Sequence, residues 1–148
     1  TPRRAVVGWD SARLAMVLAV LEARCGVALA GRDVYLNVTG GLRISEPGAD
    51  LAAAAALMSS LTGQPVPQGT ILFGEIGLSG DVRAVSHSAV RLKEAAKLGF
   101  NSAWTPPARG DAEDGGLDVV TIRKLSDLVE RFGTAEMDAI PIRERKAR

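Results

Sequence analysis

The sequence predicts a single domain of mixed α/β class. Short segments with the pattern of strands alternate along the chain with segments whose apolar residues recur at helical spacing, and this order is typical of α/β architectures. With 148 residues and 47% hydrophobic content, the chain is long enough for one proper core and too short for two. We expect one domain over residues 1–133 and a flexible charged tail over 134–148, where periodicity is lost.

The first half of the chain predicts two strands and two helices. Asp10 or Ser11 offers an oxygen that can cap a helix, and the leucines that follow recur at helical spacing. Five consecutive alanines favour a second helix, which Pro47 can begin and Gly63 can end. The expected elements are a strand at 4–9, a helix at 11–24, a strand at 33–38, a turn at 40–41 and a helix at 49–61.

The second half predicts four strands and two helices. The expected elements are strands at 70–73 and 82–85, a helix at 88–98, strands at 102–105 and 119–122, and a helix at 125–132. Glycines punctuate the segment from Gly74 to Gly80, which lacks the Gly-Lys-Ser/Thr ending that grips nucleotide phosphates. We therefore interpret this segment as a structural turn and expect no ATP site in the domain.

Composition excludes several kinds of site. The 18 basic residues nearly balance the 17 acidic ones, so no global field draws the protein to DNA or a membrane, and any nucleic-acid contact must come from local clustering. Cys25 and His87 are each the only residue of their type, which excludes an intrachain disulfide, a cysteine metal cage and a multi-histidine zinc site. The single cysteine fits a reducing cytoplasm, and no apolar run reaches the ~20 residues of a membrane span. We expect a cytoplasmic protein.

Two segments resemble the catalytic core of the Lon protease family. The stretch from Glu46 to Gly63 resembles the family's nucleophile helix, and Gly74-Glu75-Ile76 resembles its second landmark. Aligned without gaps on these landmarks, the family's serine falls on Gly48 and its catalytic lysine on Ala89. The resemblance implies a Lon proteolytic-domain fold in which both members of the dyad are absent, so the domain is not expected to be an enzyme.

The resemblance is closer to the C-terminal Lon-like domain of the bacterial RadA/Sms recombination and repair proteins, and it covers roughly residues 4–132. It implies that the complete protein also has a zinc-binding motif and a RecA-like, DNA-dependent ATPase, so that Zn, ATP and Mg belong to a part outside this chain. It further implies a homo-oligomer, expected to be a hexamer, that binds single-stranded or branched DNA. The segments that carry it are Arg13-Leu14-Ala15, Asp33 to Val38, Gly40 to Arg43 and Arg91 to Ala95.

The candidate DNA-binding residues are Arg13, Arg32, Arg43 and Arg91. Arginine in or beside a loop can present its planar fork to phosphate, and a ring would repeat each modest patch around one channel. An ordinary solvated face or an intersubunit salt bridge is the alternative for each of them. Because aromatic residues make up only 4% of the chain, binding is expected to be electrostatic and indifferent to sequence.

Two alternative functions stay open. A divergent Lon-like peptidase could use a displaced dyad of Ser45 and Lys93, or the domain could serve only assembly without touching DNA. We interpret Asp50 and Glu46 as stabilising the helix dipole or capping the helix. A carboxylate at Asp50 would also repel the developing charge of an oxyanion, which argues against acyl transfer.

Overall fold

The computed structural model describes residues 1–108 and 114–133. The expected tail at 134–148 and part of the polar loop after Pro106 lie outside the described residues. The elements are β1 (Arg4–Val7), α1 (Ser11–Cys25), β2 (Val34–Asn37), η1 (Thr39–Gly41), η2 (Pro47–Ala49), α2 (Asp50–Thr62), β3 (Thr70–Leu72), β4 (Glu75–Ile76), β5 (Val82–Arg83), α3 (Ser88–Lys97), β6 (Ser102–Thr105), β7 (Asp118–Thr121) and α4 (Leu125–Glu130).

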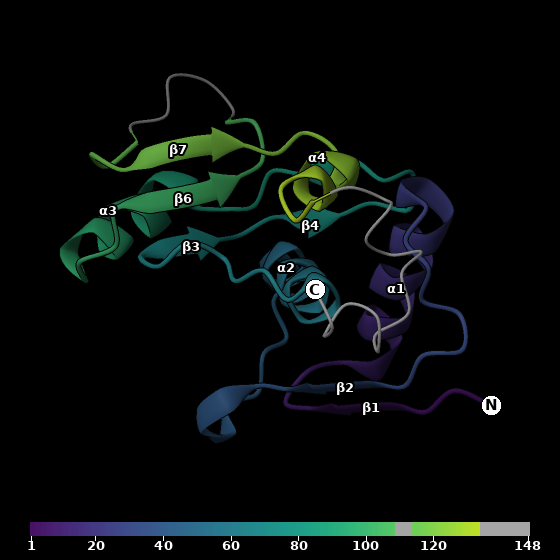
Figure 1. Ribbon diagram of the computed structural model, residues 1–148. Coiled ribbons are helices and arrows are strands. Elements are labelled where there is room, and N and C mark those ends of the chain that lie inside the picture. The colour runs from purple at the N-terminus through teal and green to yellow at the C-terminus, as the bar shows by residue number, and fades with distance from the viewer. Residues whose placement is uncertain (109–113, 134–148) are drawn as a thin grey trace.

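The strands form three small sheets. β1 pairs with β2 in parallel, β6 lies between β3 and β7 in a parallel three-stranded sheet, and β4 pairs with β5 antiparallel. Figure 1 shows the β1–β2 pair on one side of the molecule and the β3–β6–β7 sheet on the other, with α2 between them. The mixed α/β class is therefore confirmed, whereas the specific Lon-like fold stays a prediction.

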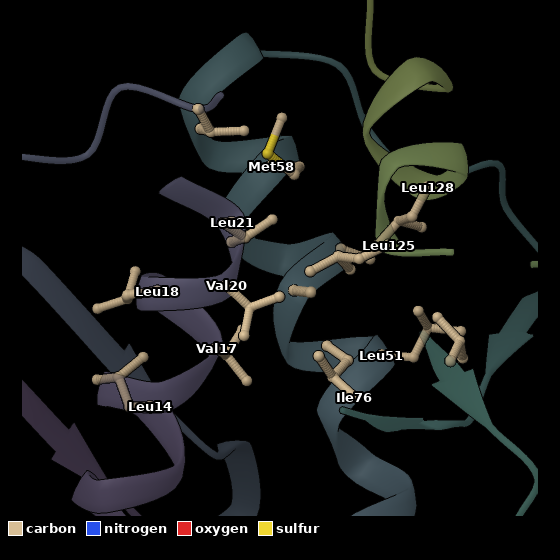
Figure 2. Packing of buried hydrophobic residues seen from close by; sticks show 14 of the residues in the cluster. Leu14, Val17, Leu18, Val20, Leu21, Leu51, Met58, Ile76, Leu125 and Leu128 are labelled. Atoms are coloured by element: carbon tan, nitrogen blue, oxygen red, sulfur yellow. The ribbon is translucent and has the colours of Figure 1, made fainter. Parts of the chain in front are cut away.

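The main hydrophobic core lies where three helices meet. α1 packs against α2 and α4, and α2 also contacts α4. The helical spacing of Leu14, Val17 and Leu21 turns one stripe of α1 into this core, where all three side chains are buried. Figure 2 shows Val17 and Leu21 on the side of α1 that faces the labelled side chains of α2. Burying each such side chain stabilises the fold by about 2 kcal/mol. The partners labelled in the figure are Leu51, Met58, Ile76, Leu125 and Leu128.

A second, smaller core lies beneath α3. Leu92 and Ala95 from this helix pack with buried Phe73, Ala103 and Leu117. This contact fixes α3 against the three-stranded sheet, because Ala103 belongs to β6 and Phe73 directly follows β3.

The helices and most strands begin and end within a few residues of their predicted positions. The strand predicted at 4–9 is shorter, because Gly8 adopts a left-handed φ of 84° and Trp9 then turns into the core. Any side chain at Gly8 would meet the Leu42 carbonyl oxygen at 2.5 Å from its Cβ. β4 lies in the segment predicted to be a turn. Within residues 1–108 and 114–133, no helix is long and apolar enough to cross a membrane.

Candidate functional site

A cleft of about 550 Å³ lies where the end of β1, the start of α1 and the segment 43–47 meet. Backbone bonds hold these pieces together, since the Ile44 N–H donates to the Gly8 carbonyl at 2.8 Å. Asp10 caps α1 by accepting from the Ala12 N–H at 2.7 Å. The cleft has a charged and polar lining over an apolar base of Val6, Trp9 and Ile44. The polar lining residues are Asp10, Ser11, Arg13, Arg43, Ser45 and Glu46.

Gly48, the position that aligns with the family's serine, is buried just beyond this lining. Its carbonyl accepts from the Gly74 N–H at 2.9 Å, and the Gly74 carbonyl accepts from the Leu51 N–H at 3.1 Å. A Cβ atom added at Gly48 would lie 3.1 Å from Glu46 Oε1 and 3.3 Å from Val85 Cγ1. A side chain at this position would therefore require the Glu46 carboxylate to give way by a few tenths of an ångström.

Asp50 is fully buried at the start of α2 and forms an ion pair with Arg13 of α1. Arg13 donates through both Nε, at 3.2 Å from Oδ1, and Nη2, which bonds Oδ2. The Ile76 N–H adds a third bond, at 3.1 Å from Oδ2. These donors satisfy a carboxylate that has no access to water. The pair also joins α1 to α2 directly.

This geometry corrects two predictions about these residues. Asp50 is not the N-cap residue, because Ala49 holds that position, and its carboxylate serves the ion pair as well as lying in the first turn. With Arg13 bound to it, the carboxylate is neutralised, so the predicted repulsion of an oxyanion loses its force. Arg13 Nε and Nη2 are engaged by Asp50 within the fold, and the DNA-binding role of Arg13 stays a prediction.

Glu46 and Arg91 form a second ion pair, which links the cleft to α3. Arg91 also donates from Nε to the Ser86 carbonyl at 2.9 Å, and its guanidinium lies 5.7 Å from the centroid of the Phe73 ring. The predicted capping role of Glu46 is wrong, because its side chain makes no cap hydrogen bond. Its carboxylate serves the ion pair with Arg91 instead.

The remaining two arginines lie at opposite ends of β2, as the sequence predicted. Arg32 precedes β2 and donates from Nε to the Ala28 carbonyl at 3.0 Å. Arg43 follows η1, is exposed, and makes no side-chain hydrogen bond or ion pair within residues 1–108 and 114–133. The structure therefore gathers Arg13, Arg43 and, through Glu46, Arg91 at one cleft, and leaves Arg32 apart.

The residues of the alternative dyad occupy different elements. Ser45 lines the cleft, outside any helix, while Lys93 is exposed on α3. Ala89, which aligns with the family's lysine, is exposed in the first turn of α3. In the described part of the chain, no three His, Cys, Asp or Glu side chains are grouped so that they could hold a metal ion.

Asp81 and Cys25, whose pKa values are shifted, lie outside the cleft, as does Arg83, whose pKa is raised by its bond to Asp81. The Ser79 hydroxyl donates to Asp81 at 2.6 Å and Arg83 Nε donates to it at 2.9 Å, and these bonds lower the pKa of Asp81. Burial raises the pKa of the Cys25 thiol. Neither Asp81 nor Cys25 was singled out as a site by the sequence, and neither contacts the cleft.

The chain forms a mixed α/β domain with a charged cleft. Arg43 lines this cleft, and Gly48, at the position that aligns with the Lon family's serine, lies beside it. The chain is similar to proteins named DNA repair protein RadA: it is 57% identical over 91% of its length to that of Brucella abortus, 47% over 84% to that of Synechocystis and 42% over 88% to that of Escherichia coli. The chain belongs to this RadA family of DNA repair proteins. It spans between 25% and 29% of the length of these relatives. No family model matches the chain.

Proposed function

We propose that this domain is a non-proteolytic, Lon-like scaffold of a RadA/Sms-type recombination and repair protein, which holds a hexameric ring together and contributes to DNA binding. The ATPase, with ATP and Mg, and the zinc motif would belong to the rest of the protein, since the chain spans 29% of its relative from Brucella abortus. Membership of a family named for DNA repair supports a role in repair. What this domain itself contributes has to be argued from the residues of the cleft.

The observation that carries the DNA-binding role is the unengaged guanidinium of Arg43 at the cleft. A planar fork without an acidic partner can bond two phosphate oxygens at once. Arg91 is paired with the half-exposed Glu46, so DNA could compete for it, whereas Arg13 is paired with the buried Asp50. We therefore rank Arg43 first and Arg91 second. Arg32 would contribute only where another part of the ring brings DNA to the far end of β2.

The non-proteolytic assignment rests on Gly48 and Ala89. A serine–lysine peptidase needs a hydroxyl as nucleophile and an amine to take its proton, and neither side chain supplies one. A fluorophosphonate probe tests the displaced dyad directly: labelling that Ser45→Ala abolishes would overturn this assignment.

The central experiment is sedimentation velocity of the chain with a labelled single-stranded oligonucleotide, at low and at moderate salt. We expect DNA to move with a hexamer-sized species and binding to weaken steeply with salt, because phosphate contacts release counterions. Arg43→Gln should weaken binding about fivefold, if one charged phosphate contact is lost. Arg24→Gln is the matched control, since Arg24 is exposed on α1 outside the cleft lining.

The other outcomes separate the parts of the proposal. A hexamer that carries no DNA would leave the assembly role and contradict DNA binding by this domain. A monomer without DNA would contradict both roles for the isolated domain. Equal weakening by Arg43→Gln and Arg24→Gln would point to general charge and remove the cleft as the contact site.

A further inference from the structure

Glu46 lies between the cleft and the guanidinium of Arg91. Its side chain lines the cleft beside Arg43, while its carboxylate binds Arg91 on α3. An acidic side chain beside Arg43 opposes phosphate binding by repulsion and also holds the guanidinium of Arg91. Glu46 therefore determines whether the guanidinium of Arg91 is available to an anion at the cleft.

Arg91 keeps its position by contacts that do not involve Glu46. Its Nε donates to the Ser86 carbonyl at 2.9 Å, and its guanidinium carbon lies 5.7 Å from the centroid of the buried Phe73 ring. Leu92, the next residue, anchors this turn of α3 in the smaller core. If Glu46 moves away, Arg91 stays in place with Nη2 free to donate, so the site is pre-organised for another anion.

Glu46, in contrast, is free to leave. It lies between η1 and η2, and 48% of its side chain is exposed, against 29% for Arg91. An ion pair this open to water is weak, because solvent screens it and both ions can be hydrated separately. A phosphate oxygen can accept the hydrogen bond that Arg91 Nη2 now donates to Glu46. Arg43 lines the cleft beside Glu46 and can bond the same phosphate backbone.

We infer that Glu46 is a built-in competitor for nucleic-acid phosphate, which holds Arg91 in the free protein and must be displaced before Arg91 can bind a phosphodiester. In that exchange the Nη2 hydrogen bond passes from the carboxylate to a phosphate oxygen, with no covalent step. The inference rests on the proposed DNA-binding function and names the residue that sets its affinity.

The test compares four proteins: the 148-residue chain, Glu46→Gln, Arg91→Gln and the double variant. Anisotropy of a fluorescent oligothymidylate is measured over a series of salt concentrations. Glu46→Gln should bind about fivefold more tightly, with a salt dependence steeper by about 0.7 in the log–log slope, the value for one added phosphate on a single strand. In the Arg91→Gln background, Glu46→Gln should bring no gain.

Each other outcome overturns the inference. A gain that persists in the Arg91→Gln background, or that Glu94→Gln on the exposed face of α3 reproduces, would mean that charge removal alone raises affinity. Equal binding by the unsubstituted chain and Glu46→Gln overturns this inference alone, whereas no binding by either overturns the proposed DNA binding with it. Thermal unfolding checks that the variants fold, and Glu46→Ala replaces Glu46→Gln should that variant fail to fold.

Discussion

The carboxylate of Asp50 is fully buried, so its negative charge must be stabilised by the groups that hydrogen-bond to it. Arg13 and the Ile76 N–H supply three hydrogen bonds to its two oxygens. Removing one partner of a buried ion pair leaves the other charge uncompensated, which costs about 3 kcal/mol or more. We expect Arg13→Ala to lower the free energy of unfolding by about 3 kcal/mol in urea denaturation.

A double-mutant cycle isolates this pair from the packing of its side chains. Asp50→Ala removes the carboxylate as well, so the double variant should be less destabilised than the sum of the two single variants. Arg24→Ala, on the exposed part of the same helix, should change stability by less than about 0.5 kcal/mol. Additive effects of the two single variants would contradict coupling between Arg13 and Asp50.

At the scale of elements, the β4–β5 hairpin holds Asp81 in a network whose strength depends on pH. The bonds from Ser79 and Arg83 lower the pKa of Asp81 in the folded state. A folded pKa below the unfolded one contributes stability above the unfolded pKa, and this contribution is lost as pH falls through the folded pKa. Asp81→Asn should therefore lower the melting temperature at pH 7, and this difference should shrink as the pH falls through the unfolded and then the folded pKa.

The size of this effect is small, because the Asp81 side chain is 44% exposed and water screens its bonds. Asp118→Asn is the control, since the Asp118 side chain is exposed and accepts no hydrogen bond in the described part of the chain. A difference between Asp81→Asn and the unsubstituted chain that stays constant from pH 7 to pH 2 would rule out the carboxylate as its source.

The alanines of α2 show how one helix divides between core and solvent. Ala55 is buried in the main core, whereas Ala56, the next residue, is exposed. A leucine at position 55 has no room, so Ala55→Leu should lower the free energy of unfolding by about 2 kcal/mol through overpacking. Ala56→Leu keeps the helix preference without the crowding and should be nearly neutral in the same urea titration. Equal effects of both substitutions would mean that the core adjusts freely around α2.

Local patterns predicted the elements because local physics determines them. The capping oxygen of Asp10, the left-handed Gly63 after α2 and the leucine stripe of α1 each act within a few residues. β4 was missed because two residues are too few to carry a periodicity. Apart from β4, the helices and strands were therefore predicted with the correct type, and their boundaries were off by a few residues.

The charged cleft could be predicted only in part, for the opposite reason. Its two ion pairs join residues that are 37 and 45 positions apart, and no local rule pairs them. The sequence singled out Arg13, Arg43 and Arg91, which the fold brings to the cleft, together with Arg32, which lies apart. It interpreted Asp50 and Glu46 as stabilising the helix dipole or capping the helix, and the ion pairs were not foreseen. Acidic residues beside a helix start and basic residues on other helices were the available signal, and only the packing of α1 and α3 decided their pairing.

At the scale of the whole molecule, α4 closes the main core. Leu125, Leu128 and Phe132 are buried, and the Phe132 ring meets Trp104 of β6 edge-on, with centroids 6.1 Å apart. α4 thereby ties the three-stranded sheet to α1 and α2. The domain boundary at residue 133 stays a prediction.

Two shortened chains test that boundary. A chain that ends at Gly133 should keep the urea midpoint of the complete chain, if residues 134–148 form the predicted tail. A chain that ends at Lys124 loses α4 and exposes the core faces of α1 and α2, and removing even one large core side chain costs about 3 kcal/mol, so it should not fold cooperatively. A large loss of stability in the first chain would move the boundary beyond Gly133, whereas cooperative unfolding of the second would contradict the closing role of α4.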